Sequence, residues 1–218
     1  MRLWTGFKVI DRAIGGIPSR TSLLVSGPKH TGKTYFSSKM FASNVRRGNP
    51  ALFVSLDRPS SDMIPMFTQL IGRKALASLL EKETARFFDL YEYDFEEKDL
   101  TLKELYYQVA REFKAADVPP ALLVMDSFNR ITNSYSKTSV SWFVSRLSRT
   151  AKEFGSSCVF VVRTGPGSPV LRKKADGEIL FRRAEEKIII KAGLPNKARR
   201  IFMGEYDGRR LKLLDVID

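Results

Sequence analysis

The sequence predicts an α/β fold: a mostly parallel, twisted sheet flanked by helices, with an antiparallel extension at its C-terminal end. Two observations carry this prediction. Short and almost uninterrupted apolar runs, typical of strands buried on both faces, alternate with segments of helical periodicity as far as Gly165. Beyond it the pattern changes to short strands separated by turns. We therefore expect a single domain over residues 1–218, with a core over 1–165 and a basic loop and antiparallel extension over 166–218.

The first half of the chain alternates strands and helices. Short apolar runs predict strands over residues 22–26, 51–55 and 86–91. A helix is expected over residues 35–45, which include no Pro or Gly and place apolar side chains on one face. A second amphipathic helix is expected over residues 102–113, where Leu, Tyr, Val and Phe recur at helical spacing.

The second half begins with a buried strand over residues 121–125, which stops at Asp126. A helix with apolar residues at helical spacing follows over residues 140–154, and then a further core strand over residues 158–162. Residues 165–169 form a loop by their Gly, Pro and Ser content. The extension is expected to contain three short strands, at residues 187–191, 200–203 and 211–214.

A glycine-rich motif lies between the first strand and the helix that follows it: Gly27-Pro28-Lys29-His30-Thr31-Gly32-Lys33-Thr34. It fits G-x-x-x-x-G-K-[ST], the phosphate-binding P-loop, in the strand–loop–helix context that this chemistry requires. In such a loop, backbone N–H groups surround a phosphate, Lys33 reaches the β- and γ-phosphates, and Thr34 ligates Mg²⁺. We therefore expect the loop and the following Tyr35 to bind ATP with Mg²⁺, although GTP is not excluded. A chance glycine turn is the alternative.

Asp126 supplies the second part of the expected nucleotide site. It ends a hydrophobic strand well downstream of the P-loop, where a nucleotide-hydrolysing enzyme needs a carboxylate to hold the water shell of Mg²⁺. Taken alone, an aspartate after an apolar strand is usually a helix cap or a turn former. Together with the P-loop, the pattern predicts catalytic roles for Lys33 and Asp126.

Segments around these motifs resemble a known family. Thr5-Gly6-Phe7-Lys8-Val9-Ile10-Asp11, followed by Gly15-Gly16-Ile17-Pro18, is similar to the N-terminal part of RecA-superfamily ATPases of the RadA and KaiC kind. Asp126-Ser127 matches their Asp-Ser pair. In length and layout the chain most resembles RadB, an archaeal paralogue of RadA, and Asp94-Phe95-Glu96-Glu97 is similar to a stretch found there. The resemblance implies a RecA-like P-loop NTPase core.

The resemblance also places a catalytic glutamate at the end of the second core strand, where this chain has Asp57. Arg58 then stands at the position of a second glutamate that KaiC-like members often carry. An aspartate is one methylene shorter, and a general base contributes about 10²–10⁴-fold to a rate, so we expect slow hydrolysis but intact nucleotide binding. The alternative for Asp57 is a turn residue before Pro59.

Two further elements follow from the resemblance. A polar sensor falls at Arg163 or Thr164, where recombinases usually have glutamine, and this departure argues against DNA-coupled ATP turnover. Lys197 and Arg199 resemble a K-x-R element that reaches the nucleotide of a neighbouring subunit, with a solvated hairpin turn as the alternative. The resemblance thus implies a homo-oligomer or a complex with a RecA- or RadA-like protein, while a monomer stays open.

The charge distribution suggests a polyanionic partner. The net charge is +13, and residues 121–218 hold 19 of the 37 Lys and Arg residues but only 10 of the 24 Asp and Glu residues. By the resemblance, single-stranded DNA would bind without sequence preference to two loops, over residues 129–137 and 165–174. The candidate contacts are Arg130, Tyr135, Lys137, Arg172, Lys173 and Lys174. A basic but solvated surface is the alternative.

Composition limits the cellular setting. The longest apolar runs are far below the length that spans a bilayer, and the N-terminus lacks a signal-peptide pattern. Cys158 is the sole cysteine, so an internal disulfide is excluded, and it lies in an apolar run that favours a buried, inert thiol. We therefore expect a cytoplasmic protein without a membrane partner.

Three functions remain from the sequence. The leading hypothesis is a RadA- or RadB-like recombinase paralogue that binds ATP, Mg²⁺ and DNA, hydrolyses ATP weakly, and supports homologous recombination and DNA repair. The first alternative is a KaiC-like regulatory ATPase that acts on protein partners without DNA. The second is an interaction protein that binds ATP without hydrolysing it. The basic loops favour the first hypothesis, and Asp57 with Arg58 favours the last.

Overall fold

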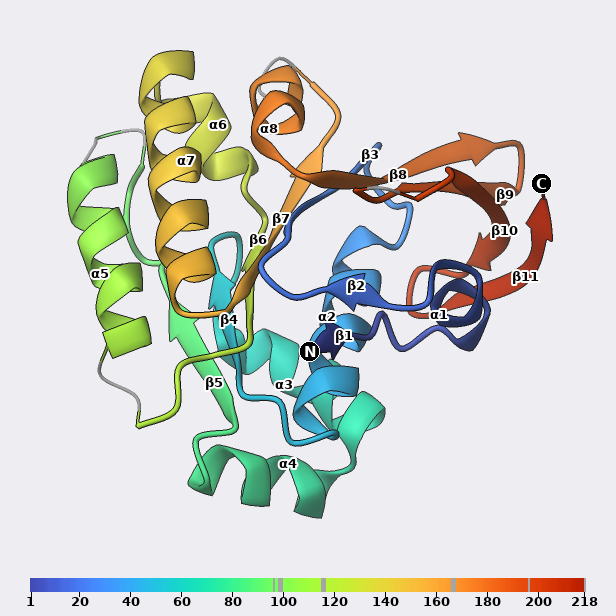
Figure 1. Ribbon diagram of the computed structural model, residues 1–218, viewed down its shortest axis with the longest axis horizontal. Helices are drawn as coiled ribbons and strands as arrows, with labels where there is room; N and C mark the ends of the chain where they lie inside the picture. Colours follow the sequence, from blue (N-terminus) through green and yellow to red (C-terminus); the bar gives the residue numbers. More distant parts are fainter. Residues whose placement is uncertain (96, 98–99, 115–116, 166–167, 196, 218) are drawn as a thin grey trace.

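The fold is described by a computed structural model, which covers the chain except residues 96, 98–99, 115–116, 166–167, 196 and 218. Glu96, of the RadB-like stretch, and Pro166 and Gly167, of the second expected loop, therefore lie outside the described residues. Within the described residues, the centre is a nine-stranded sheet with the order β11-β10-β9-β8-β3-β7-β6-β4-β5 (Figure 1). The predicted fold, a mostly parallel sheet with antiparallel C-terminal strands, is confirmed.

The core of the sheet is parallel and its C-terminal part is antiparallel. The strands of the parallel part are β3 (Ser22–Gly27), β4 (Ala51–Ser55), β5 (Ala85–Asp89), β6 (Leu122–Asp126), β7 (Ser157–Arg163) and β8 (Gly177–Ala184). The antiparallel strands are β9 (Lys187–Gly193), β10 (Arg200–Tyr206) and β11 (Leu211–Ile217). Strand β8, which was not predicted from the sequence, joins the two parts because it pairs parallel with β3 and antiparallel with β9.

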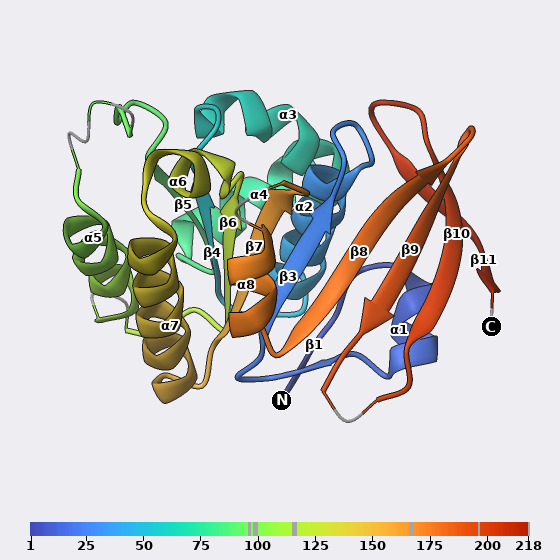
Figure 2. The same cartoon turned by 90° about the horizontal axis from the view of Figure 1, so that it is seen from above.

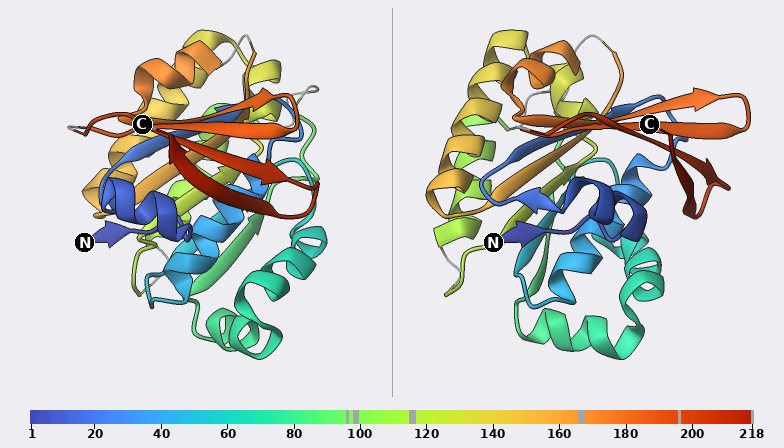
Figure 3. Two further views of the ribbon diagram at one scale, coloured as in Figure 1. Left: turned by 90° about the vertical axis from the view of Figure 1, so that its right-hand side faces the viewer. Right: turned by 45° about the vertical axis from the view of Figure 1, so that its right-hand side comes forward.

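Helices cover both faces of this sheet (Figure 2). One face carries α1 (Lys8–Ile14), α2 (Lys33–Val45), α3 (Ser60–Ile71) and α4 (Arg73–Glu81). The other face carries α5 (Leu102–Lys114), α6 (Asn129–Ser134), α7 (Lys137–Glu153) and α8 (Ser168–Lys174). Helix α1 packs against β10 and β11 (Figure 3), next to a separate ribbon of β1 (Arg2–Leu3) and β2 (Ile17–Pro18).

Each face of the sheet has its own hydrophobic core, because successive side chains of a strand point to opposite faces. In β3, Leu23 and Val25 join the core shared with α2, whereas Leu24 joins the core shared with α7. Since both faces are buried, the parallel strands read as almost continuous apolar runs, which is the pattern that predicted them.

The parallel strands all end on the same side of the sheet, which is called its carboxyl edge. Gly27, Asp126 and Arg163 end β3, β6 and β7 at this edge, and Asp57 follows β4 there. The turn between β10 and β11 reaches the same edge, beside the loop after β3 (Figure 2). Ligands of open α/β sheets bind at such an edge.

Two segments that were expected to be DNA-binding loops are largely helical. Residues 129–134 form α6, which is anchored by the buried Ile131. Residues 168–174 form α8, which is anchored by the buried Leu171; Pro169 lies in its first turn, where proline is tolerated. The loop prediction was wrong for these residues, because their polar, Gly and Pro content obscured the buried anchors.

Cys158 is buried in β7, and burial raises the pKa of its thiol to about 12. The thiol is therefore unreactive, as the sequence predicted. Within the described part of the chain, none of the helices combines the length and the apolar character needed to cross a lipid bilayer.

Candidate functional site

The loop after β3 is shaped by its glycines and by the strands beside it. Gly32 has a φ of +83°, and a Cβ at this position would lie 3.0 Å from the Tyr206 ring. A Cβ on Gly27 would lie 2.6 Å from the Cβ of Phe181 in β8. Both positions therefore need glycine, because β8 and β10 pack directly against the loop.

Hydrogen bonds from two neighbouring strands hold this loop. The N–H of Thr164, just after β7, donates to the Gly27 carbonyl (3.0 Å). From β8, the Arg183 guanidinium donates to the His30 carbonyl (3.1 Å). Helix α2 begins at Lys33, so its unpaired N-terminal N–H groups lie at the end of the loop. This arrangement suits a phosphate, which accepts hydrogen bonds from those N–H groups.

The Lys33 side chain folds back onto the loop, where its ammonium donates to the Pro28 carbonyl (2.5 Å). Burial lowers the pKa of Lys33 to about 8; the Asp126 carboxylate opposes this change and the Arg163 guanidinium adds to it. A bound polyanion would favour the charged form, because it supplies negative charge next to the buried ammonium.

Asp126 is buried at the end of β6, beside the start of α2. Its carboxylate accepts hydrogen bonds from Ser37 Oγ (3.0 Å) and Thr34 Oγ1 (3.4 Å). Burial raises the pKa of Asp126 to about 6, while these two hydrogen bonds oppose the rise. Ser37 was not identified from the sequence; the available signal was its position one helical turn after Lys33, on the same face of α2.

These residues fit a magnesium ion that arrives with a nucleotide. The Thr34 hydroxyl and the Asp126 carboxylate are hard oxygen ligands 3.4 Å apart, next to the phosphate loop. Among the described residues, no cluster of three or more His, Cys, Asp or Glu side chains could hold a metal by itself. Phosphate oxygens and water would therefore complete the ligand set.

A cavity of about 750 Å³ opens at the carboxyl edge of the sheet. This volume lies in the range of small-molecule and cofactor sites. Its walls come from the P-loop, from α3 and α6, from the ends of β4, β6 and β7, and from the β10–β11 turn. The cations that line it are Lys29, Lys33, Arg58, Arg130, Arg163 and Arg209. A cavity with this lining favours a polyanionic ligand.

Asp57 and Arg58 are exposed on the cavity wall, directly after β4. Other residues close the turn that contains them. Ser55 Oγ donates to the Arg58 carbonyl (2.5 Å), and the Asp89 carboxylate accepts from the N–H (2.9 Å) and the hydroxyl (2.8 Å) of Ser60. The Asp57 carboxylate has no hydrogen-bond partner among the residues that the structure describes. The Asp57 side chain therefore does not close this turn.

Of the two sensor candidates, Arg163 lines the cavity and Thr164 does not. The N–H of Arg163 donates to Asn129 Oδ1 (2.7 Å), which also accepts from Ser127 Oγ (2.9 Å). Asn129 thus links the ends of β6 and β7 beside the cavity. The sequence did not indicate this role, because Asn129 begins a helix that was expected to be a loop.

The β10–β11 turn adds residues to the cavity that the sequence did not indicate. Tyr206, Gly208 and Arg209 line it, and the Tyr206 ring contacts Gly32 of the P-loop. The Tyr206 hydroxyl donates to the Gly208 carbonyl (2.8 Å), and the Asp207 carboxylate accepts from the N–H of Arg209 (2.8 Å). The sequence indicated a turn at Asp207-Gly208, but only the fold brings this turn to the P-loop.

Lys197 and Arg199, the expected K-x-R element, lie away from this cavity. The Lys197 ammonium donates to the carbonyl of Ile14, at the C-terminal end of α1, and to the Gly16 carbonyl (3.5 Å). Arg199 is exposed in the connection between β9 and β10, at the opposite edge of the sheet from the β10–β11 turn. Lys197 thus bonds within its own chain, whereas Arg199 is accessible.

Arg130, a DNA-binding candidate, is engaged within the chain. Its guanidinium donates to the carbonyls of Leu56 (2.7 Å), Tyr91 (2.7 Å) and Tyr93 (2.8 Å). It also lies over the Phe95 ring, 5.0 Å from the ring centroid. Arg130 therefore joins the segments that follow β4 and β5.

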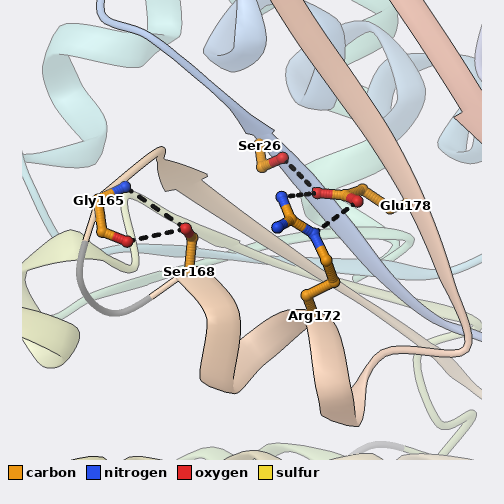
Figure 4. A network of polar contacts seen from close by, with 5 residues as sticks. All are labelled: Ser26, Gly165, Ser168, Arg172 and Glu178. Carbon is orange, nitrogen blue, oxygen red and sulfur yellow. Dashed lines mark hydrogen bonds and ion pairs between the residues drawn. The ribbon is translucent and has the colours of Figure 1, made fainter.

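Two other DNA-binding candidates also have partners within the chain. The Tyr135 hydroxyl donates to the Leu100 carbonyl. Arg172 on α8 donates two hydrogen bonds of 2.8 Å to Glu178, and Glu178 accepts a third from Ser26 Oγ (2.6 Å) (Figure 4). This network ties α8 to the strand that leads into the P-loop. The remaining candidates are exposed: Lys137, Lys173 and Lys174.

Comparison with known proteins places this chain in a family. Residues 3–193 match the KaiC family of ATPases. The chain belongs to the KaiC family. The KaiC-like protein PH0186 of Pyrococcus horikoshii has the same fold, with a TM-score of 0.78 and 18% identity; the match covers 98% of this chain and 99% of that one. Membership of the KaiC family of ATPases implies nucleotide binding.

Two curated relatives match different lengths of this KaiC-family chain. UPF0273 protein PH0284 of Pyrococcus horikoshii is 26% identical over 191 residues, which are 82% of this chain and 76% of the relative. UPF0273 protein MK0039 of Methanopyrus kandleri is 39% identical over 57 residues, which are 26% of this chain and 23% of the relative. The comparisons thus support the KaiC side of the resemblance, and a RadA- or RadB-specific identity stays a prediction.

Proposed function

We propose that this KaiC-family protein is a nucleotide-controlled switch that binds ATP with Mg²⁺ and hydrolyses it slowly. One observation carries the proposal. Lys33, Thr34 and the buried Asp126 meet at the P-loop, whereas the wall after β4 offers Asp57 and Arg58 in place of a glutamate. The groups that would bind phosphates lie together, and the carboxylate that would activate water belongs to an aspartate, which is one methylene shorter than a glutamate.

Binding would be carried by the loop and the cations around it. The N–H groups at the start of α2 and the Lys33 ammonium would hold the phosphates. Thr34 and Asp126 would hold Mg²⁺, which neutralises phosphate charge when it is bound. Arg163 and Arg209 line the same cavity and would stabilise the triphosphate by charge.

Hydrolysis would depend on Asp57. Its exposed carboxylate lies on the cavity wall, so it can accept a proton from water there. A positioned general base contributes about 10²–10⁴-fold to a rate, and a side chain that is one methylene too short forfeits part of that factor. Slow turnover would leave the ATP-bound form populated for long periods, which is the property that a switch requires.

The test compares binding of a fluorescent ATP analogue, with and without Mg²⁺, to the wild-type protein and to Lys33→Ala. The wild type should bind more tightly with Mg²⁺. Lys33→Ala should bind about 10- to 150-fold more weakly, because it loses a charge-assisted contact. Lys39→Ala is the matched control, since Lys39 lies on the same helix but contacts the Phe7 ring and does not line the cavity. Equal affinities for the wild type and Lys33→Ala would disprove the site.

A second candidate function is a RadA- or RadB-like recombinase paralogue that binds DNA and supports homologous recombination and repair. The net charge of +13 and the exposed Lys137, Lys173 and Lys174 support it. The internal bonds of Arg130 and Arg172 count against it. A recombinase paralogue should bind single-stranded DNA in an ATP-dependent way that the double variant Lys173→Ala/Lys174→Ala weakens. If added DNA changes neither the ATP turnover rate nor the ATP affinity, a switch that acts on proteins is favoured.

We further propose that Arg199 contributes to the nucleotide site of a neighbouring copy or of a RecA- or RadA-like partner. Its exposure at the sheet edge opposite the cavity supports this assignment, because it cannot reach the nucleotide of its own chain from there. Arg199→Ala should lower the specific turnover rate at high protein concentration and leave it unchanged at low concentration. A specific rate that does not depend on protein concentration would contradict the proposal.

A further inference from the structure

The outer face of α5 and α7 carries exposed aromatic side chains. The two helices lie side by side, at the opposite end of the molecule from β10 and β11 (Figures 1 and 2). Tyr107 on α5 is 59% exposed, and Trp142 on α7 is 42% exposed. Tyr and Trp are enriched at binding surfaces relative to the rest of a protein surface.

A third ring holds these two side chains in place. Tyr106 lies between them, with its ring centroid 5.3 Å from that of Tyr107 and 5.8 Å from that of Trp142. Its hydroxyl shares a hydrogen bond with Thr150 Oγ1 (2.9 Å), and the Arg146 guanidinium lies 6.0 Å from its ring centroid. The rings therefore form one preorganised group.

Cations flank these rings along both helices. On α5, Lys103, Tyr107 and Arg111 recur every four residues and so share one face. On α7, Arg146 and Arg149 follow Trp142 at spacings of four and three residues, on the same side of the helix. All four cations are exposed, and none of them forms an ion pair with another described residue.

Nearby carboxylates offset part of the charge of these cations. Glu104 caps the start of α5, where it accepts from the N–H (2.8 Å) and the hydroxyl (2.7 Å) of Thr101. Glu112 pairs with Arg86 (3.6 Å). Glu153 lies at the C-terminal end of α7, one turn beyond Arg149. Lys103, Arg111, Arg146 and Arg149 outnumber the two carboxylates that have no ion pair with a described residue, Glu104 and Glu153, so the surface around the rings keeps a net positive charge.

We propose that this aromatic–basic face, made up of Lys103, Tyr107, Arg111, Trp142, Arg146 and Arg149, binds single-stranded nucleic acid, either DNA or RNA. Bases would stack on Tyr107 and Trp142, and phosphates would lie beside the flanking cations. Such a surface tolerates any sequence, because every base has a π-face. Net positive charge beside exposed rings matches a flexible polyanion that carries aromatic bases.

The aromatic–basic face is separate from the nucleotide cavity. None of its residues lines that cavity. The proposal therefore goes beyond the nucleotide switch and does not rest on it, because strand binding at this face needs no P-loop. It also differs from binding at residues 129–137 or 165–174, where Arg130 and Arg172 have partners within the chain.

The test measures the binding of a fluorescein-labelled oligothymidine of about 16 nucleotides, within the site sizes of single-strand binding modules. The Tyr107→Ala/Trp142→Ala variant should lose roughly 5- to 140-fold in affinity for each stacked base. Trp142→Phe keeps a ring and should bind like the wild type, which separates lost stacking from a folding defect. The strand should quench tryptophan fluorescence in Trp4→Phe, where Trp142 is the remaining tryptophan, but not in Trp142→Phe.

Matched variants locate the site. Lys173→Ala/Lys174→Ala on α8 and Lys33→Ala in the P-loop should leave strand affinity unchanged. Arg111→Gln/Arg149→Gln should reduce the slope of log affinity against log salt by about 1.4, since each neutralised phosphate of a single strand contributes about 0.7. An oligouridine of the same length distinguishes RNA from DNA. Tighter binding of oligouridine than of oligothymidine would identify RNA as the ligand, and weaker binding would identify DNA.

Three results would overturn the proposal. If Tyr107→Ala/Trp142→Ala binds like the wild type, the strand does not stack on this face, and a loss in the α8 variant would move the site to α8. If heparin, a polyanion without bases, binds and quenches equally well, the face recognises negative charge alone. An acidic protein would then fit the face as well as a nucleic acid does. The absence of any strand binding at low salt would also reject the proposal for this face. It would have no bearing on the separate proposal of a nucleotide-controlled switch.

Discussion

Replacing Asp126 by asparagine should stabilise the nucleotide-free protein at neutral pH. Asp126 is buried at the end of β6, and burial raises the pKa of its carboxyl from 3.8 to about 6. At pH 7 the folded protein therefore holds a charged carboxylate in a buried position, which costs free energy. Asparagine has the same shape, and its Oδ1 can still accept a hydrogen bond from Ser37 or Thr34.

The sign and the size of this effect follow from the two pKa values. Because the folded pKa is raised above the unfolded one, the carboxyl has no effect on stability below about pH 4, and it lowers stability as the pH rises toward 6. At 1.36 kcal/mol per pKa unit, the loss reaches about 3 kcal/mol at pH 7. Asp126→Asn should recover this amount at pH 7 and almost none at pH 4.

Urea unfolding at about pH 4, 6 and 7.5, without nucleotide or Mg²⁺, gives the free energy of unfolding of the wild type and of Asp126→Asn. The titration of all other groups cancels in the difference between the two proteins. Ser37→Ala is the matched control, because it removes a hydrogen bond to the carboxylate and should destabilise the protein by about 1–3 kcal/mol at pH 7. If Asp126→Asn is less stable than the wild type by an amount that does not vary with pH, the reasoning is refuted. The buried carboxylate would then be stabilised as an anion by its neighbours.

Three further changes test the nucleotide site. ATP affinity should fall above about pH 8, by up to tenfold per pH unit, because the Lys33 amine must take up a proton before it can pair with the phosphates. Calorimetry in buffers with different heats of ionisation measures this proton uptake. Asp57→Glu should raise the rate of phosphate release by up to about 10²–10⁴-fold with unchanged ATP affinity, and an unchanged rate would return Asp57 to a turn-forming role. Gly32→Ala should destabilise the protein by about 1–3 kcal/mol more than Gly48→Ala in thermal unfolding. Both glycines have φ near +80°, but only a Cβ on Gly32 meets the Tyr206 ring, so equal losses would contradict that contact.

Local sequence signals located the parts of the site that lie within one strand–loop–helix unit. The P-loop is encoded in eight consecutive residues, because Gly27, Gly32 and Lys33 act through the backbone and side chains of a single turn. The position of Asp126 could be read in the same way, from the end of an apolar strand. Continuous apolar runs also predicted the parallel strands, since burial on both faces removes the alternation of polar and apolar residues.

Residues that reach the site through long-range pairing could not be located in this way. Tyr206 and Arg209 line the cavity only because β8 pairs with β3 and the antiparallel strands follow it in register. No short pattern encodes that register, and β8 itself was missed because residues 182–184 are exposed and partly charged. Helices α6 and α8 are too short for a helical period to show, and each has one buried apolar anchor, Ile131 or Leu171.

If both proposals hold, the positive charge of the chain serves two sites of different kinds, and ionic strength should separate them. Arg163 and Arg209 line a cavity that would enclose a small ligand, where salt screens charges weakly. The four cations of the aromatic–basic face lie in open solvent, so a bound strand would release counterions there, with a slope of about −2.8 in log affinity against log salt. A fourfold rise in salt should therefore weaken strand binding about 50-fold and ATP binding far less. If both ligands lose affinity in parallel, a single basic surface binds them, and the division into two sites is wrong.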